Sequence, residues 1–154
     1  MRRTGLMIAL NFLVLVVSCR TSYYLEIIDG QSGSIVKRIL IDEGEIFTIK
    51  FIHSVEKAPI FESCYIDLKG RIVLKEVKFK KIGVGYGKYL PTLYPLEQRS
   101  GWYYMSNINV PAKLAYRVGY VANHTLVVRG KHYPFSELVP PGDLLKIVPT
   151  KRCD

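Results

Sequence analysis

Hydrophobic and polar residues alternate along most of the chain beyond residue 22, and no segment there repeats with the period of a helix. Short runs rich in β-branched and aromatic residues are separated by turn residues, as in strands joined by hairpins. The expected strands are residues 23–28, 35–41, 46–53, 60–68, 71–80, 116–121, 125–129, 132–135 and 144–148, and the strands 116–121 and 125–129 are expected to pair with each other. The pattern predicts an all-β fold after an N-terminal signal segment: an antiparallel β-sandwich or barrel of about eight or nine strands.

Residues 83–111 interrupt this alternation. The segment is rich in glycine, proline and aromatic residues, and its pattern predicts no strand of any length. A long connection of this kind inside a compact domain is uncommon and is often functional. Its rings, among them Tyr86 and Trp102, either line a ligand cleft or pack over one open end of the sheet.

The first residues have the features of an export signal. Two arginines precede an apolar run over residues 6–17, which is shorter than the roughly 20 residues that span a bilayer. The following Val-Val-Ser-Cys resembles a lipobox, in which Cys19 becomes the lipidated first residue. We therefore expect a signal peptide over 1–18 and a single β domain over 19–154 with a lipid anchor at Cys19. Plain secretion and an uncleaved anchor are the alternatives.

The cellular compartment determines which partners the net charge of +9 can attract. Outside the cytoplasm, a basic protein faces phospholipid headgroups or an anionic ligand, so nucleic acid is not an expected partner. We expect an extracytoplasmic protein that is anchored to the membrane, in the periplasm or on the cell surface. In that compartment Cys64 and Cys153 are candidates for a disulfide, and two unpaired thiols are the alternative.

In the stretch FIHSVEKAPIFE, residues 51–62, a histidine ends one apolar run of an expected strand and a glutamate lies at the start of the next. Alternation places His53 on the apolar face of one expected strand and Glu62 on the apolar face of the next. A hairpin centred near residues 57–58 would bring these two side chains opposite each other. Because a buried carboxylate needs a partner, the imidazole is expected to contact it.

Several roles remain open for this pair. His53 and Glu62 could hold a metal with His124 or Glu56, although no short ligand pair such as His-x-His supports a zinc site. They could act as base and orienting group for Ser54, although no nucleophile-elbow motif surrounds that serine. They could anchor a ligand or partner protein, or simply fix the register of the hairpin. No catalytic residue, metal or cofactor is assigned from these patterns.

The run Ile52-His53-Ser54-Val55-Glu56-Lys57-Ala58-Pro59, followed by Glu62, resembles the signature of the family called domain of unknown function 1850. The Gly83-Val84-Gly85 segment is similar to that family's Gly-x-Gly turn. The resemblance implies a small exported or membrane-anchored protein, encoded beside TRAP-type solute transporters of the TAXI class. The family positions that carry over are His53, Ser54, Glu56, Pro59, Glu62, Gly83 and Gly85.

These observations together predict an exported, lipid-anchored accessory protein that binds a small molecule or a membrane partner in support of solute uptake by a TRAP-type transporter. The candidate binding residues are His53, Ser54, Glu56, Glu62, Gly83, Gly85, Tyr86, Trp102 and His124. A metal-dependent or His/Glu hydrolase and a purely structural surface domain are the alternatives.

Overall fold

A computed structural model of the chain describes residues 22–82 and 93–152. This part consists almost entirely of β-strands with one 3₁₀ turn, η1 (Phe135–Glu137), and none of its helices is long and apolar enough to cross a membrane. The strands are β1 (Ser22–Asp29), β2 (Ile35–Asp42), β3 (Phe47–Ile52), β4 (Pro59–Ile66), β5 (Ile72–Phe79), β6 (Leu96–Arg99), β7 (Trp102–Met105), β8 (Val110–Pro111), β9 (Leu114–Arg117), β10 (Thr125–Val128), β11 (Lys131–Pro134) and β12 (Leu144–Lys151).

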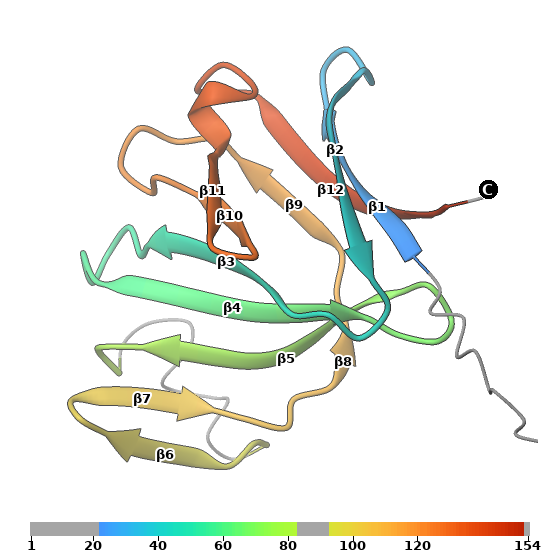
Figure 1. Ribbon diagram of the computed structural model, residues 1–154. Coiled ribbons are helices and arrows are strands. Elements are labelled where there is room, and N and C mark those ends of the chain that lie inside the picture. Colours follow the sequence, from blue (N-terminus) through green and yellow to red (C-terminus); the bar gives the residue numbers. More distant parts are fainter. Residues whose placement is uncertain (1–21, 83–92, 153–154) are drawn as a thin grey trace, which may run out of the picture.

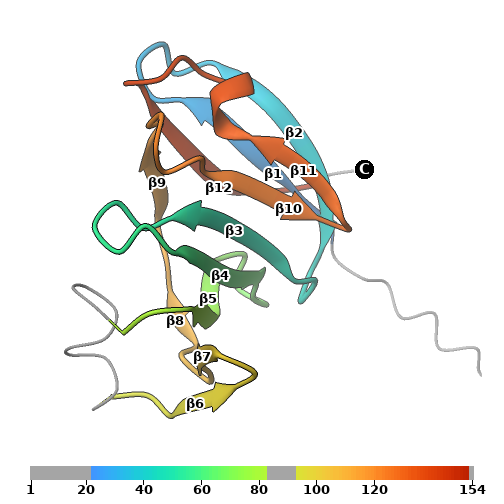
Figure 2. The same cartoon turned by 90° about the vertical axis from the view of Figure 1, so that its left-hand side faces the viewer.

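The strands form two antiparallel sheets (Figures 1 and 2). The smaller sheet has the order β2-β1-β12-β9. The larger sheet has the order β11-β10-β3-β4-β5-β7-β6, and β8 also pairs with β5. The sheets are not closed into a barrel, so the structure confirms the all-β prediction and decides in favour of the sandwich.

The main core lies between the two sheets. It forms because every second side chain of a strand points to the same face, so that Leu25 and Ile27 of β1 are fully buried in one cluster with Phe47 and Ile49 of β3. A second, smaller cluster lies on the part of the larger sheet that extends past the smaller one, and its members are Ile60, Val77, Phe79, Met105 and Ile108.

A hairpin occupies part of the segment for which no strand was expected. Strands β6 and β7 pair with Arg99 opposite Trp102, and the two residues between them, Ser100 and Gly101, have φ values of 48° and 74°. Two consecutive positive φ values are typical of the tight turns that favour hairpins. The prediction of a strandless segment is therefore wrong for residues 96–111, because the high glycine and proline content concealed short strands.

The pairing of the later strands also differs from the expectation. Residues 116–121 and 125–129 were expected to form a pair, but β9 ends at Arg117 and pairs with β12, whereas β10 pairs with β3 and β11. Val118 then follows β9 with a backbone hydrogen bond to Asp143 rather than to β10. Each strand thus joins a different sheet, which places the apolar faces of both strands in the common core.

Candidate functional site

Glu62 points into the space between the sheets. It lies on β4 on the same face as the buried Ile60 and Cys64, and its side chain is half-buried. The hydroxyl of Tyr116, on β9 of the other sheet, donates a hydrogen bond of 2.8 Å to the Glu62 carboxylate. The inward orientation expected from alternation is confirmed, and a tyrosine supplies the hydrogen bond that a partly buried carboxylate requires.

The expected contact between His53 and Glu62 is wrong. In the structure Glu62 pairs with Ile49, and the last paired residues before the turn are Ile52 and Pro59. The hairpin is therefore centred between residues 55 and 56 and not near 57–58. A shift of the hairpin centre by one residue changes the residue opposite Glu62 by two positions. Glu62 therefore lies opposite Ile49, and His53 lies in the turn, just after the end of β3.

The signature residues 53–58 instead form a six-residue turn between β3 and β4. The N–H of His53 donates to the carbonyl of Ala58, and the N–H of Lys57 donates back to the carbonyl of His53, at 2.9 Å each. The Nδ1 atom of His53 accepts a hydrogen bond of 3.2 Å from the N–H of Glu56, and Ser54 is exposed. The backbone and ring of His53 therefore stabilise its own turn.

His124 lies immediately before β10, in a cluster of aromatic rings. Its ring centroid is 5.0 Å from that of Tyr116, 5.2 Å from that of Phe51 and 5.8 Å from that of Phe135. Its Nδ1 atom is buried and has no hydrogen-bond partner among the described residues, although other parts of the side chain are accessible. Burial lowers the pKa of His124, which favours the neutral form of the ring.

Tyr116, which was not among the predicted site residues, connects two that were, Glu62 and His124. Tyr116 bonds to Glu62 and packs on His124, so the three side chains form a chain across the interior. No group of three or more His, Cys, Asp or Glu side chains with the geometry of a metal site occurs within residues 22–82 and 93–152. Tyr116 was visible in the sequence only as one residue of an expected strand.

Trp102 belongs to a different surface. The Lys78 ammonium lies 4.4 Å from the centroid of the Trp102 ring, 5.4 Å from that of Phe61 and 5.5 Å from that of Tyr104. Lys80 also lies over Trp102, at 5.2 Å, and Arg99 lies over Tyr104, at 5.0 Å. We call this surface the aromatic–lysine face, and it consists of Phe61, Lys78, Lys80, Arg99, Trp102 and Tyr104.

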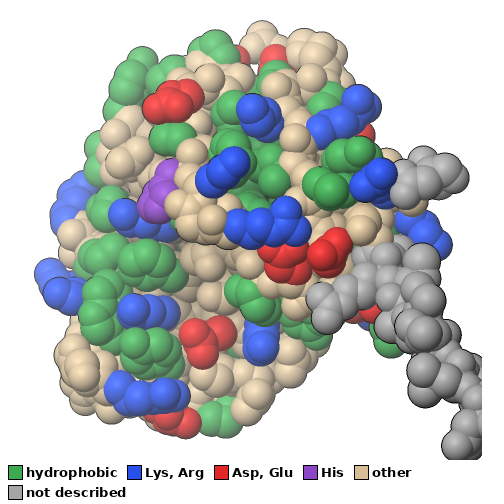
Figure 3. Space-filling model, in the orientation of Figure 1, with side chains coloured by type: hydrophobic (Ala, Val, Ile, Leu, Met, Phe, Trp, Pro, Cys, Tyr) green, Lys and Arg blue, Asp and Glu red, His purple; other side chains and the backbone are tan. Residues whose placement is uncertain are grey.

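The aromatic–lysine face is the outer side of the larger sheet. Phe61 lies next to Glu62 in β4, and adjacent residues of a strand point to opposite faces, so Trp102 and Glu62 are separated by the sheet. Phe61, Lys78 and Tyr104 lie in one row across β4, β5 and β7. In Figure 3 hydrophobic and basic side chains alternate over these strands, in the lower left of the view. The signal in the sequence was the alternation of lysines with buried residues in β5.

Some predicted residues lie outside the described part or keep an untested role. Gly83, Gly85 and Tyr86 fall in residues 83–92, and Cys19 falls in residues 1–21, so all four lie outside it, as does Cys153. Cys64 is buried in the main core and has no disulfide partner among the described residues. Burial, and secondarily the charge of Glu62, raises its pKa to about 12. The Cys64–Cys153 disulfide stays a prediction.

Comparisons with known proteins agree with the signature. No curated protein and no solved structure matches the chain. A family model described as "Domain of unknown function (DUF1850)" matches residues 47–135, which is more than half of the 154 residues and includes β3, β4 and β10. The chain belongs to the DUF1850 family.

Proposed function

We propose that this protein is an exported accessory protein of solute uptake, anchored by a lipid on Cys19, that lies with its aromatic–lysine face on the anionic headgroups of the membrane. The observation that carries the proposal is the stack in which one ammonium, that of Lys78, is within 5.5 Å of the centroids of three rings. Tryptophan and tyrosine prefer the interface between water and lipid, and lysines there attract anionic headgroups.

The charge of this face favours an anionic surface. Lys50 extends the row of Phe61, Lys78 and Tyr104 on the next strand, since Lys50 pairs with Phe61. The acidic side chains near the row are Glu97, paired with Arg99 at 2.6 Å, and Glu76, which accepts a hydrogen bond of 2.9 Å from Ser106. The lysines therefore outnumber the acidic groups that could neutralise them.

The single tryptophan of the chain gives a direct test. The full chain is placed in nanodiscs of phosphatidylglycerol or phosphatidylcholine that carry brominated acyl chains, which quench tryptophan at short range. We expect Trp102 emission to be quenched in the anionic nanodiscs only. Each lysine near an anionic surface contributes about 1 kcal/mol, so the K78E/K80E variant is expected to lose at least about 2 kcal/mol of this interaction.

The matched control is Lys131→Glu and Lys69→Glu, the same change of charge at exposed lysines outside the face. This control should keep the quenching of the wild type. Equal quenching in both kinds of nanodisc, or in K78E/K80E, would overturn the role of the face. Retention of the fold is checked by far-UV circular dichroism.

The anchor and the link to transport need separate tests. The lipobox-like residues before Cys19 support lipidation, which is tested by incorporation of radiolabelled palmitate into the wild type and its absence from Cys19→Ser. The resemblance to a family encoded beside TAXI-class transporters supports the accessory role. Loss of solute uptake on deletion of the gene, restored by the wild type and not by Cys19→Ser, is the expected result. Unchanged uptake on deletion would refute the accessory role.

A further inference from the structure

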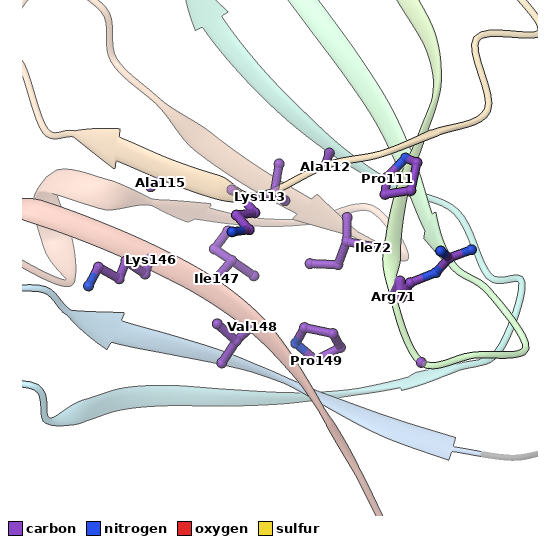
Figure 4. A pocket seen from close by; sticks show the side chains of 12 residues that line it. Arg71, Ile72, Pro111, Ala112, Lys113, Ala115, Lys146, Ile147, Val148 and Pro149 are labelled. Atoms are coloured by element: carbon purple, nitrogen blue, oxygen red, sulfur yellow. The ribbon is translucent and has the colours of Figure 1, made fainter.

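An open, apolar groove lies where the chain crosses from the larger sheet to the smaller one (Figure 4). Strand β8 pairs with β5 of the larger sheet, and three residues later β9 begins to pair with β12 of the smaller sheet. The small residues Gly70, Ala112 and Ala115 are among those that line the groove. The groove has a volume of about 680 Å³, within the range of small-molecule sites.

The walls of the groove are mainly hydrocarbon. Ile72 of β5 and Ile147 of β12 line it although they are almost completely buried, and the more exposed Val148, Pro149 and Pro111 complete the wall. In Figure 4 these residues extend from the Lys146 end of the groove to the Arg71 end. An elongated apolar wall of this kind fits a linear hydrocarbon chain, because each methylene group that leaves water for an apolar surface adds to the affinity.

Every ionisable side chain that lines the groove is basic. These are Arg71, Lys113 and Lys146. Arg71 is neutralised by Asp67, with two guanidinium nitrogens at 2.7 and 2.8 Å from one carboxylate oxygen. Lys113 and Lys146 are exposed and form no ion pair within the described residues. Two lysines without a carboxylate partner among the described residues thus line the groove and attract an anion to it.

We propose that the groove binds a fatty carboxylate, with its hydrocarbon chain along Ile72, Ile147 and Pro149 and its carboxylate between the ammonium groups of Lys113 and Lys146. The complementarity of charge distinguishes this ligand from a neutral lipid, since no acidic residue lines the groove. The site shares no residue with the aromatic–lysine face and is independent of the role proposed for that face.

The test uses the full chain in phosphatidylcholine nanodiscs and a dodecanoate that carries a photoreactive diazirine on its chain. After irradiation the labelled peptides are identified by mass spectrometry. Labelling is expected to saturate and to map to residues 111–115 and 146–149. Unlabelled dodecanoate should compete, whereas octanoate, four methylene groups shorter, should need at least about ten times the concentration.

Two variants test the two parts of the site. K113E/K146E is expected to raise the half-saturating concentration by at least about tenfold, because the carboxylate loses its charge-assisted hydrogen bonds. Ala115→Phe places a ring in the groove from an exposed position and should abolish the saturable labelling. Lys131→Glu on β11 makes the same kind of charge change outside the groove and should label as the wild type does.

Three results would overturn the proposal. The first is labelling that does not saturate or that maps outside the groove. The second is equal labelling of wild type, K113E/K146E and Ala115→Phe. The third is competition by dodecanol as strong as competition by dodecanoate, since the lysines would then recognise no carboxylate. Quenching of Trp102 is measured on the same variants, so failure of the groove and failure of the aromatic–lysine face are distinguished.

Discussion

Replacing His124 with phenylalanine is expected to stabilise the protein, although His124 was a candidate binding residue. The ring packs against Phe51, Tyr116 and Phe135, and a phenyl group keeps these contacts. What is lost is the buried Nδ1 atom, which has no hydrogen-bond partner among the described residues. An unsatisfied buried polar atom costs about 1–3 kcal/mol, and this is the expected gain in the free energy of unfolding.

The gain should also depend on pH. Burial lowers the pKa of His124 in the folded state, so the unfolded chain binds more protons as the pH falls towards and below its ordinary value of 6.5. The wild type therefore loses stability through this group as the solution becomes more acidic. His124→Phe lacks this loss, so the difference between variant and wild type should be larger at pH 5.5 than at pH 8.

The assay is urea unfolding at both pH values, followed by circular dichroism, with thermal melts as a second measurement. For a chain of this length about 1 kcal/mol corresponds to 2–4 °C in Tm. His124→Asn serves as the control, because it removes the ring and should destabilise the protein. A destabilised His124→Phe, or a gain that is equal at the two pH values, would refute the reasoning and indicate that Nδ1 is hydrogen-bonded.

Three further predictions concern the other candidate residues. Tyr116→Phe removes the donor to the Glu62 carboxylate, so it is expected to cost about 1.5–3 kcal/mol in urea unfolding, and an unchanged midpoint would contradict this. His53→Ala removes the acceptor for the Glu56 N–H and should cost about 0.5–1.5 kcal/mol with the fold retained; His53→Asn is expected to recover part of this. The pKa of Cys64 is raised to about 12, so iodoacetamide at pH 8 should leave its peptide unmodified until urea unfolds the protein, as mass spectrometry will show.

Alternation predicted the strands well where they are long. The five strands from β1 to β5 lie within one or two residues of their expected bounds, and the core residues Phe47 and Ile49 lie on the face of their strand that alternation predicted to be apolar. Strands β6 and β7 were missed because four residues are too few to show a period. The pairing of β9 was missed because its partner, β12, follows nearly thirty residues later, and local pattern carries no information about such a partner.

The candidate site was predicted in part. The inward orientation of Glu62 followed from the period of two, which is a local property of a strand. The position of His53 did not follow, since the hairpin is centred about two residues earlier in the chain than expected, and this shifts the register of its strands. Lys57 has a φ of 50° in that turn. This left-handed conformation is uncommon for lysine, so the sequence did not predict it.

The sequence by itself determined the fold class and which side of each long strand is apolar, because side-chain direction alternates along any extended chain. Only the tertiary structure decided which surfaces meet. It joined Glu62 to Tyr116 across the sandwich, gathered Phe61, Lys78 and Trp102 on the outer face of one sheet, and left the groove beside Lys113 and Lys146. These contacts bring together residues far apart in the chain, and they depend on how the two sheets bury their apolar faces against each other.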